Sequence, residues 1–128
     1  MDKWDSETFP LSRLLGMDVD VVEPGRTLTR LRINETHLNP NGAVHGGVLF
    51  TMIDTAMGLA TMTVLDHGRC ASIEVHLRFL RPASSGVLEA HATVVSQGRK
   101  VVHLEARIHD DADRLVATGT GTFAVVTT

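Results

Sequence analysis

A single carboxylate, Asp54, lies in a long stretch of chain that is otherwise free of charge. Residues 46–65 contain no other ionisable side chain. The stretch has the length of a membrane span, but a carboxylate at its centre is costly in lipid, so a helix enclosed by protein explains the composition better. Inside a protein, Asp54 is either satisfied by a nearby hydroxyl or solvent, or kept dry enough to act as a general base or nucleophile.

The tripeptide His45-Gly46-Gly47 stands where the helix that carries Asp54 should begin. The first N–H groups of a helix have no partner within it, and they lie at the positive end of the helix dipole. Glycine also allows a substrate to approach the backbone closely. These features are those of an oxyanion hole for a carbonyl substrate, and the alternative is an ordinary glycine-rich turn.

The spacing of Gly46 and Asp54 separates the two groups on their common helix. Eight residues at 1.5 Å rise per residue place them roughly 12 Å apart. Groups that act on one carbonyl must both lie within about 3 Å of the reacting atoms. If both serve one reaction, they therefore come from different subunits, with two central helices antiparallel about a two-fold axis.

The surrounding elements follow from the hydrophobic pattern. A short helix is expected at 6–15, capped by Ser6, and then strands at 17–22 and 27–33 joined by a turn at 23–26. A loop at 37–44 leads into the helix, which should run from His45 to about Leu65. The four further strands are expected at 70–80, 87–95, 101–108 and 115–126.

This order predicts one α+β domain over residues 1–128, in which an antiparallel sheet wraps a long helix. The helix is apolar on nearly every face, so it should be enclosed. Because such a sheet covers only one side of the helix, the remaining apolar faces require a partner, and an oligomer is expected.

Composition narrows the classes of function. The net charge is −3, and the basic residues form no stripe of the kind that nucleic-acid binding requires. The one cysteine, Cys70, cannot form an intrachain disulfide, and no apolar signal segment opens the chain, so a cytoplasmic protein with a structural thiol is expected. The His/Glu pairs at 74/76 and 103/105 lack a third ligand by spacing, so no metal is predicted.

Two segments resemble the hotdog-fold acyl-CoA thioesterases of the PaaI type. They are Asn39-Pro40-Asn41-Gly42-Ala43-Val44-His45-Gly46-Gly47, followed by Asp54, and Ser72-Ile73-Glu74-Val75-His76-Leu77-Arg78-Phe79-Leu80-Arg81-Pro82. The likeness covers about residues 11–126. It implies a six-stranded antiparallel sheet around the helix, dimers assembled into homotetramers, and hydrolysis of an acyl-CoA thioester without a cofactor.

The resemblance also implies roles for individual residues. Asp54 would be the nucleophile or the base that activates water, and Gly46 would donate its N–H to the thioester oxygen. Asn39 would orient the nucleophile or substrate, His45 would support the loop and the thioester, and the Ser72 hydroxyl would hold the attacking water.

Another branch of the family has Thr four residues after the acid, where this chain has Gly58. That difference agrees with use of the Ser72 hydroxyl and leaves the water-holding role open. The phosphates of CoA need cationic partners, because guanidinium groups match phosphate geometry. The favoured candidates for CoA binding are Arg99 and Lys100, which are expected in a turn after Gly98. The other candidates are Arg81, then Arg78 and the backbone of Gly47.

Two other functions remain open at this point. An acyl-thioester hydratase or dehydratase would pair a catalytic histidine, His37 or His45, with a carboxylate. A non-catalytic acyl-CoA binding module would use the same pocket without turnover. For a hydrolase, an aryl or medium-chain acyl group would suit a pocket lined by Leu, Met and Val.

Overall fold

The computed structural model describes residues 9–66 and 68–126. Its elements run in the order two strands, one long helix and four strands, preceded by a short helix, as the sequence predicts. They are α1 (Pro10–Leu15), β1 (Met17–Glu23), β2 (Arg26–Arg32), the 3₁₀ turn η2 (Glu35–His37), α2 (Gly46–Thr63), β3 (Cys70–Phe79), β4 (Val87–Gln97), β5 (Val101–His109) and β6 (Leu115–Val125).

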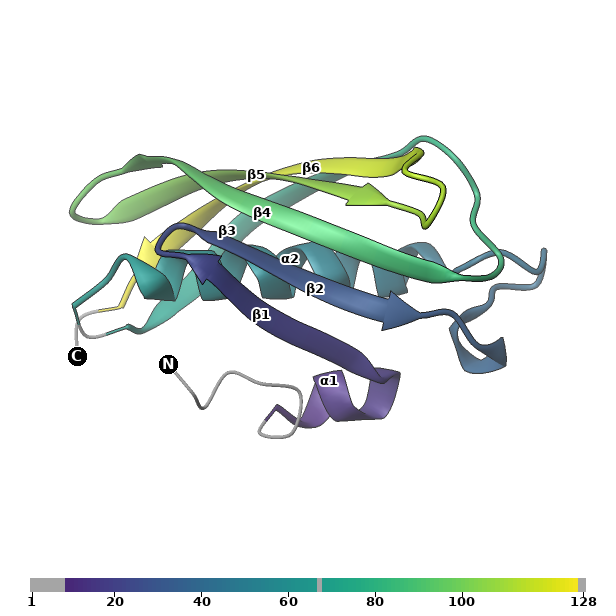
Figure 1. Ribbon diagram of the computed structural model, residues 1–128. Coiled ribbons are helices and arrows are strands. Elements are labelled where there is room, and N and C mark those ends of the chain that lie inside the picture. The colour runs from purple at the N-terminus through teal and green to yellow at the C-terminus, as the bar shows by residue number, and fades with distance from the viewer. Residues whose placement is uncertain (1–8, 67, 127–128) are drawn as a thin grey trace.

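The six strands form one antiparallel sheet in the order β1-β2-β4-β5-β6-β3. Figure 1 shows the sheet arching over α2, which lies along its inner side. The predicted α+β class, with a sheet that wraps a central helix, is therefore confirmed. Within the described residues β1 and β3 are the edges of the sheet, and β3 is the edge next to β6.

The face of α2 toward the sheet is the centre of the core. Met52, Ile53, Ala56, Met57 and Ala60 are all fully buried. Burial of these side chains supplies most of the attraction between helix and sheet, at roughly 25 cal/mol per Å² of apolar surface. Among the described residues, no helix is both long and apolar enough to cross a membrane.

Two glycines of β6 allow α2 to approach the sheet closely. A Cβ atom at Gly119 would lie 3.2 Å from Cγ2 of Ile53, and one at Gly121 would lie 2.6 Å from Sδ of Met57. A side chain at either position would require Ile53 or Met57 to shift.

Two buried threonines of β2 fasten the helix to the other half of the sheet. The Thr29 hydroxyl donates a hydrogen bond of 3.0 Å to the carbonyl oxygen of Met52, and the Thr27 hydroxyl donates to that of Ala56. Both hydroxyl groups are thereby satisfied in the core, where an unpaired one would be costly.

The predicted N-terminal helix over 6–15 is wrong at Phe9, which is extended with φ −114° and ψ 109° and acts as the N-cap. The described helix begins at Pro10, since proline at the first helical position loses no hydrogen bond. The predicted Ser6 cap lies outside the described residues. The predicted end of the long helix, about Leu65, is two residues late, because α2 ends at Thr63.

Ile73, Val75, Leu77 and Phe79 alternate with polar residues in the sequence, which predicts that all four face the core, but only the middle two of them are half-buried. Val75 and Leu77 are half-buried, but Ile73 and Phe79 are each 59% exposed. The physical reason at Ile73 is a β-bulge, because Ser72 pairs with Phe123 and Glu74 with Thr122, which leaves Ile73 unpaired. Phe79 ends the edge strand and lies against the beginning of α2.

Candidate active site

Asp54 lies on the face of α2 that the sheet leaves open. One of its carboxylate oxygens, Oδ1, is buried and has no hydrogen-bond partner among the described residues. Burial raises the pKa of Asp54 above its ordinary value. A carboxylate desolvated in this way is a stronger base than one in water, because the charged form has lost its stabilising hydration.

A cavity of about 420 Å³ opens beside Asp54. Its apolar walls come from the segment before α1, from β1, from the last turns of α2 and from β6, through Phe9, Val19, Leu59, Met62 and Phe123. Its polar side chains include Asp54, Thr55 and Ser72. An apolar cavity with a few polar groups at one place is the usual form of a small-molecule site.

The bulge in β3 adjoins Ser72, which lines the cavity with Asp54. A bulge turns side chains out of the regular alternation and is common beside active sites. The structure thus brings together Asp54 and Ser72, two of the residues predicted for catalysis. Their proximity depends on a local irregularity that the alternating sequence of the strand does not reveal.

Cys70 lines the same cavity, and its thiol lies 3.6 Å from the carbonyl oxygen of Gly58. Burial and, to a lesser degree, the negative charge of Asp54 raise the pKa of Cys70 to about 11. The thiol is therefore protonated at neutral pH, as expected of a structural rather than a nucleophilic cysteine.

The beginning of α2 presents a free backbone donor. Nδ1 of His45, the N-cap residue, accepts the N–H of Gly47 at 2.8 Å, so that N–H is already used within the chain. The N–H of Gly46 has no hydrogen-bond partner among the described residues. It lies at the positive end of an 18-residue helix, where it can bind a developing oxyanion.

A second cavity, of about 340 Å³, surrounds Gly46 and is also lined by Asn39, Phe79 and Arg81. The side-chain oxygen of Asn39 accepts the backbone N–H groups of Asn41 at 2.8 Å and Ala43 at 3.2 Å. This arrangement, with the amide oriented by its hydrogen bonds, leaves the NH₂ group of Asn39 available to a substrate.

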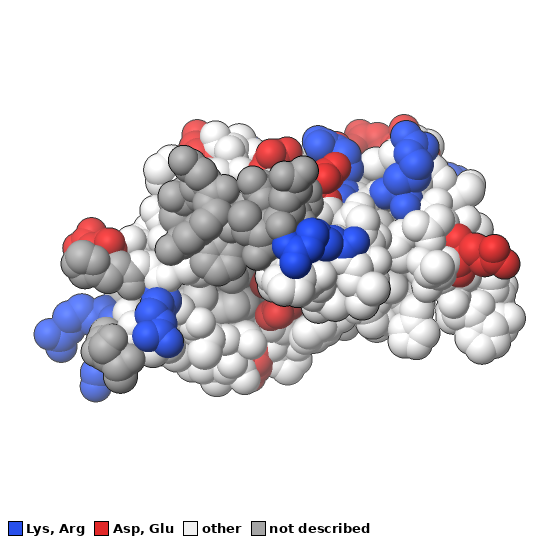
Figure 2. Space-filling model, turned by 90° about the horizontal axis from the view of Figure 1, so that it is seen from below, with Lys and Arg blue, Asp and Glu red and all other residues white. Residues whose placement is uncertain are grey.

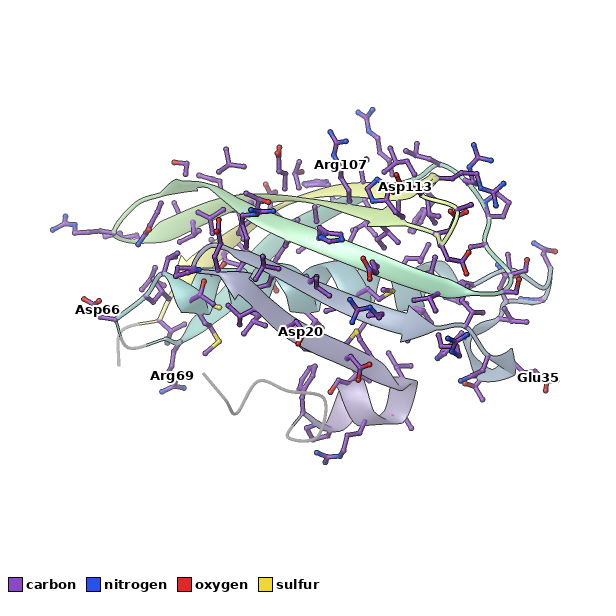
Figure 3. The ribbon with its side chains drawn as sticks, viewed as in Figure 1. Asp20, Glu35, Asp66, Arg69, Arg107 and Asp113 are labelled. Atoms are coloured by element: carbon purple, nitrogen blue, oxygen red, sulfur yellow. The ribbon has the colours of Figure 1, made fainter. Side chains whose placement is uncertain are left out.

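The two cavities have no lining residue in common. One holds Asp54 and Ser72, and the other holds Gly46, Asn39 and Arg81. Figure 3 marks the two ends of α2 by Glu35, beside its beginning, and Asp66, beyond its end. Gly46 and Asp54 therefore line two separate cavities of one chain, in agreement with the helical rise between them.

The other cations predicted to bind CoA lie elsewhere in this chain. Arg99 and Lys100 are exposed in the turn between β4 and β5. This turn lies near the C-terminal end of α2, since Nε2 of Gln97 donates a hydrogen bond of 3.0 Å to the carbonyl oxygen of Val64. Arg78 lines a groove on the outer face of the sheet. Thr118 of β6 pairs with both Arg78 and Arg107, and Figure 3 shows Arg107 on the side away from α2.

His37 is buried and structural. Its Nδ1 accepts the backbone N–H of Asn34 at 2.9 Å, and its Nε2 lies 2.7 Å from the carbonyl oxygen of Leu15. Both ring nitrogens are therefore engaged by the backbone. The described residues contain no group of three or more His, Cys, Asp or Glu side chains arranged to hold a metal ion.

Phe79 is a site residue that the sequence pattern did not single out. A Cβ atom built on Gly46 would lie 3.1 Å from Cζ of Phe79, so the ring covers the glycine that carries the free N–H. Its place in the alternating strand indicated only an inward-facing core residue. The contact joins the last residue of β3, which is still paired with Ala117 of β6, to the beginning of α2.

A six-stranded antiparallel sheet around one helix, with a desolvated carboxylate on that helix and a free donor at its start, defines the hotdog class of thioesterases. The family model of the thioesterase superfamily matches residues 41–117, and the chain belongs to that superfamily. It is a thioester hydrolase of the PaaI type, as the sequence motifs predict.

Individual relatives agree with this assignment. A Halobacterium salinarum protein that carries the provisional name of esterase is 35% identical over 90% of this chain and 83% of its own length. A single-residue variant of the phenylacetic acid degradation protein PaaI from Thermus thermophilus superposes with TM-score 0.85 at 27% identity, over 92% of this chain and 100% of that one. The Escherichia coli PaaI protein superposes with TM-score 0.87 at 25% identity, over 94% of this chain and 87% of that one.

Proposed function

We propose that the chain hydrolyses the thioester of an aryl- or medium-chain acyl-CoA at a site shared by two subunits. Asp54 of one subunit is the nucleophile or general base, and the Gly46 N–H of the other binds the thioester oxygen. The observation that carries this proposal is the buried, unpartnered Oδ1 of Asp54 beside an apolar cavity that fits an acyl group.

The chemistry follows from these groups. The Gly46 N–H stabilises the negative charge that develops on the carbonyl oxygen when the carbonyl carbon is attacked. In one route the Asp54 carboxylate attacks, the C–S bond breaks with release of CoA thiolate, and water then hydrolyses the acyl–aspartyl anhydride. In the other route Asp54 takes a proton from a water molecule held by Ser72, and that water attacks directly.

The minimal active unit in this proposal is a homodimer, and two dimers would form a homotetramer. The edge strand β3 exposes Phe79 and Ile73, Leu80 follows it, and Phe50 is exposed on α2. Figure 2 shows the molecule from below, and the lower part of this view has few charged side chains. Apolar side chains beside an unpaired strand edge support association with a second copy.

Arg81 lines the cavity of the free Gly46 N–H, so we propose that it contacts the part of CoA nearest the thioester. Arg78, Arg99 and Lys100 stand outside that cavity and could reach the same substrate only along its nucleotide end or from another subunit. The backbone N–H of Gly47 is occupied by His45, so we do not assign it to CoA. The lone thiol agrees with a cytoplasmic enzyme.

The direct test is release of CoA from a panel of acyl-CoA esters, followed with a thiol reagent. Wild-type protein is expected to turn over at least one aryl or medium-chain ester, and Asp54→Asn should lower kcat by at least ~100-fold. An Asp54→Asn variant that keeps full activity contradicts the mechanism. Binding of CoA esters without turnover would instead identify a binding module.

The hydratase alternative is tested in the same samples by following hydration of crotonyl-CoA. It would need a histidine base near the carboxylate. Both ring nitrogens of His37 are engaged by the backbone, and Nδ1 of His45 caps α2. These contacts favour hydrolysis.

A further inference from the structure

Thr55 has a hydroxyl group that the helix backbone does not use. The helix α2 contains four threonines, and the hydroxyls of Thr51, Thr61 and Thr63 each donate to a backbone carbonyl three or four residues earlier, at 2.6–2.9 Å. This is a common way to satisfy a threonine inside a helix. The Thr55 hydroxyl makes no hydrogen bond within the described part of the chain. Valine has the same shape, so packing alone does not call for a hydroxyl at this position.

Thr55 lines the cavity that holds Asp54. It follows the acid in α2, and Ser72 of β3 lines the same cavity of about 420 Å³. The Ser72 hydroxyl likewise has no hydrogen-bond partner among the residues that the structure describes, and neither has the buried Oδ1 of Asp54. Three unpaired polar groups among apolar walls suit a small polar molecule, because a bound water needs about two to four polar partners.

We infer that the Thr55 hydroxyl is a catalytic group, which holds the attacking water molecule together with the Ser72 hydroxyl and the Asp54 carboxylate. This inference rests on the proposed thioesterase function, and it gives a role to a residue for which the sequence motifs imply none. In both routes of the proposed mechanism a water molecule attacks a carbonyl carbon beside Asp54, so either route needs such a group.

A water molecule held by these three groups is still able to attack. Asp54 accepts one of its protons, one hydroxyl accepts a hydrogen bond from the other proton, and the second hydroxyl donates to one lone pair. The remaining lone pair forms the bond to the carbonyl carbon. In the general-base route the C–S bond then breaks, and the proton that Asp54 has taken passes to the departing sulfur. The products are the carboxylic acid and the thiol of CoA.

The experiment measures kcat and KM of the purified full chain for Thr55→Val, on the acyl-CoA ester that wild type hydrolyses fastest. Valine keeps the shape and removes the hydroxyl. Loss of one hydrogen bond to the reacting water should lower kcat by ~5-fold or more, with KM unchanged because the hydroxyl holds water and not the ester. Thr55→Ser, which keeps the hydroxyl, should keep most of the activity.

Thr61→Val is the matched control in the same helix. The Thr61 hydroxyl is buried, donates to the carbonyl oxygen of Met57 at 2.9 Å, and lines neither cavity. The same substitution there should leave kcat unchanged. Both valine variants should keep the thermal unfolding midpoint and the oligomeric state of wild type, measured by light scattering.

A double-mutant cycle with Ser72→Ala tests whether the two hydroxyls act on one water molecule. Two groups that hold the same water are coupled, so the combined loss in kcat should be smaller than the product of the two single losses. Losses that multiply would contradict a shared water.

The remaining outcomes separate this inference from the function on which it rests. Wild-type kcat in Thr55→Val, together with loss of activity in Asp54→Asn, overturns the role of Thr55 and leaves the thioesterase function standing. A raised KM at unchanged kcat, or a loss of activity that accompanies a changed oligomeric state, also overturns it, because the hydroxyl would then contact the ester or another subunit. If wild type releases CoA from no ester of the panel, the function itself fails, and the inference fails with it.

Discussion

The ring of Phe79 lies over Gly46, with its Cζ 3.1 Å from the position of a Cβ atom on that glycine. The last residue of the edge strand thus covers the residue whose N–H we assign to the oxyanion. Because Phe79 is 59% exposed and its ring is the far end of a side chain, the ring can move without unfolding the chain.

Gly46→Ala should therefore lower kcat with little loss of stability. The new methyl group displaces the Phe79 ring and alters the approach to the N–H, and misplacement of about 1 Å in an active site costs on the order of 100-fold in rate. Activity should return in part in the double variant Gly46→Ala/Phe79→Ala, measured as a double-mutant cycle in kcat/KM. Simple additivity of the two single effects would show that the contact does not govern the site.

Two inactive variants should complement each other if the site spans two subunits. Gly46→Pro keeps the first helical residue but removes its N–H, and Asp54→Asn removes the carboxylate. Co-expressed or refolded together, they should recover roughly a quarter of wild-type activity, since half of randomly paired dimers are hybrids with one intact site of two. Each variant mixed with itself is the control. Mixtures no more active than their parents would place both groups within one chain or deny one of them a role.

The acid limb of the pH–rate profile should lie above pH 3.8, the ordinary value for an aspartate. Burial raises the pKa of Asp54, so the active carboxylate is lost on acidification before an exposed aspartate would protonate. The profile of kcat/KM between pH 3 and 8 measures this. A limb at or below the ordinary value would contradict a desolvated catalytic carboxylate.

The raised pKa of Asp54 also makes the stability of the fold depend on pH. The folded chain binds the Asp54 proton more tightly than the unfolded chain does, so stability falls as pH rises between the unfolded and the folded pKa. Above that window the charged group destabilises the fold. Asp54→Asn should consequently raise the denaturant midpoint at pH 7, with a smaller gain at pH 3.

Cys70 offers a measure of the Asp54 charge that does not depend on activity. Burial and, to a lesser degree, the negative charge of Asp54 raise the pKa of its thiol to about 11, so alkylation by iodoacetamide at pH 8 should be much slower than for a free cysteine. In Asp54→Asn that contribution is absent, and alkylation at pH 8–9 should become faster. An unchanged rate would mean that burial alone protects the thiol. Ser84→Ala, on the exposed loop after β3, is a suitable control.

The order of elements was predictable because each has its own signature. Alternation marks the strands, and the long apolar segment with the glycines before it marks α2. The separation of Gly46 from Asp54 was predictable because helix rise is a constant of the backbone. The roles expected of Asn39 and Ser72 come from the family resemblance alone and stay predictions.

What could not be predicted depends on tertiary contacts between distant segments. The exposure of Ile73 results from a β-bulge, and a bulge leaves no period in the sequence. The contact of Phe79 with Gly46 joins two segments that are distant in the sequence. His37 looked like a possible base, and only its two backbone partners, 22 and 3 residues away, show it to be structural. Phe9, the N-cap residue of α1, lines a cavity whose other walls come from distant segments.

The hydroxyls of Thr27 and Thr29 hold α2 at the carbonyls of Met52 and Ala56, one on each side of Asp54. Two attachment points a turn apart prevent the helix from sliding along the sheet or rotating about its axis. The position of α2 on the sheet is therefore fixed, as is the separation of Gly46 and Asp54 within a chain. In the proposed site shared by two subunits, any adjustment of the distance between Asp54 and the Gly46 N–H would come from how the two subunits pack on each other. Substitutions at their contact should then alter turnover even when the residues of both cavities are unchanged.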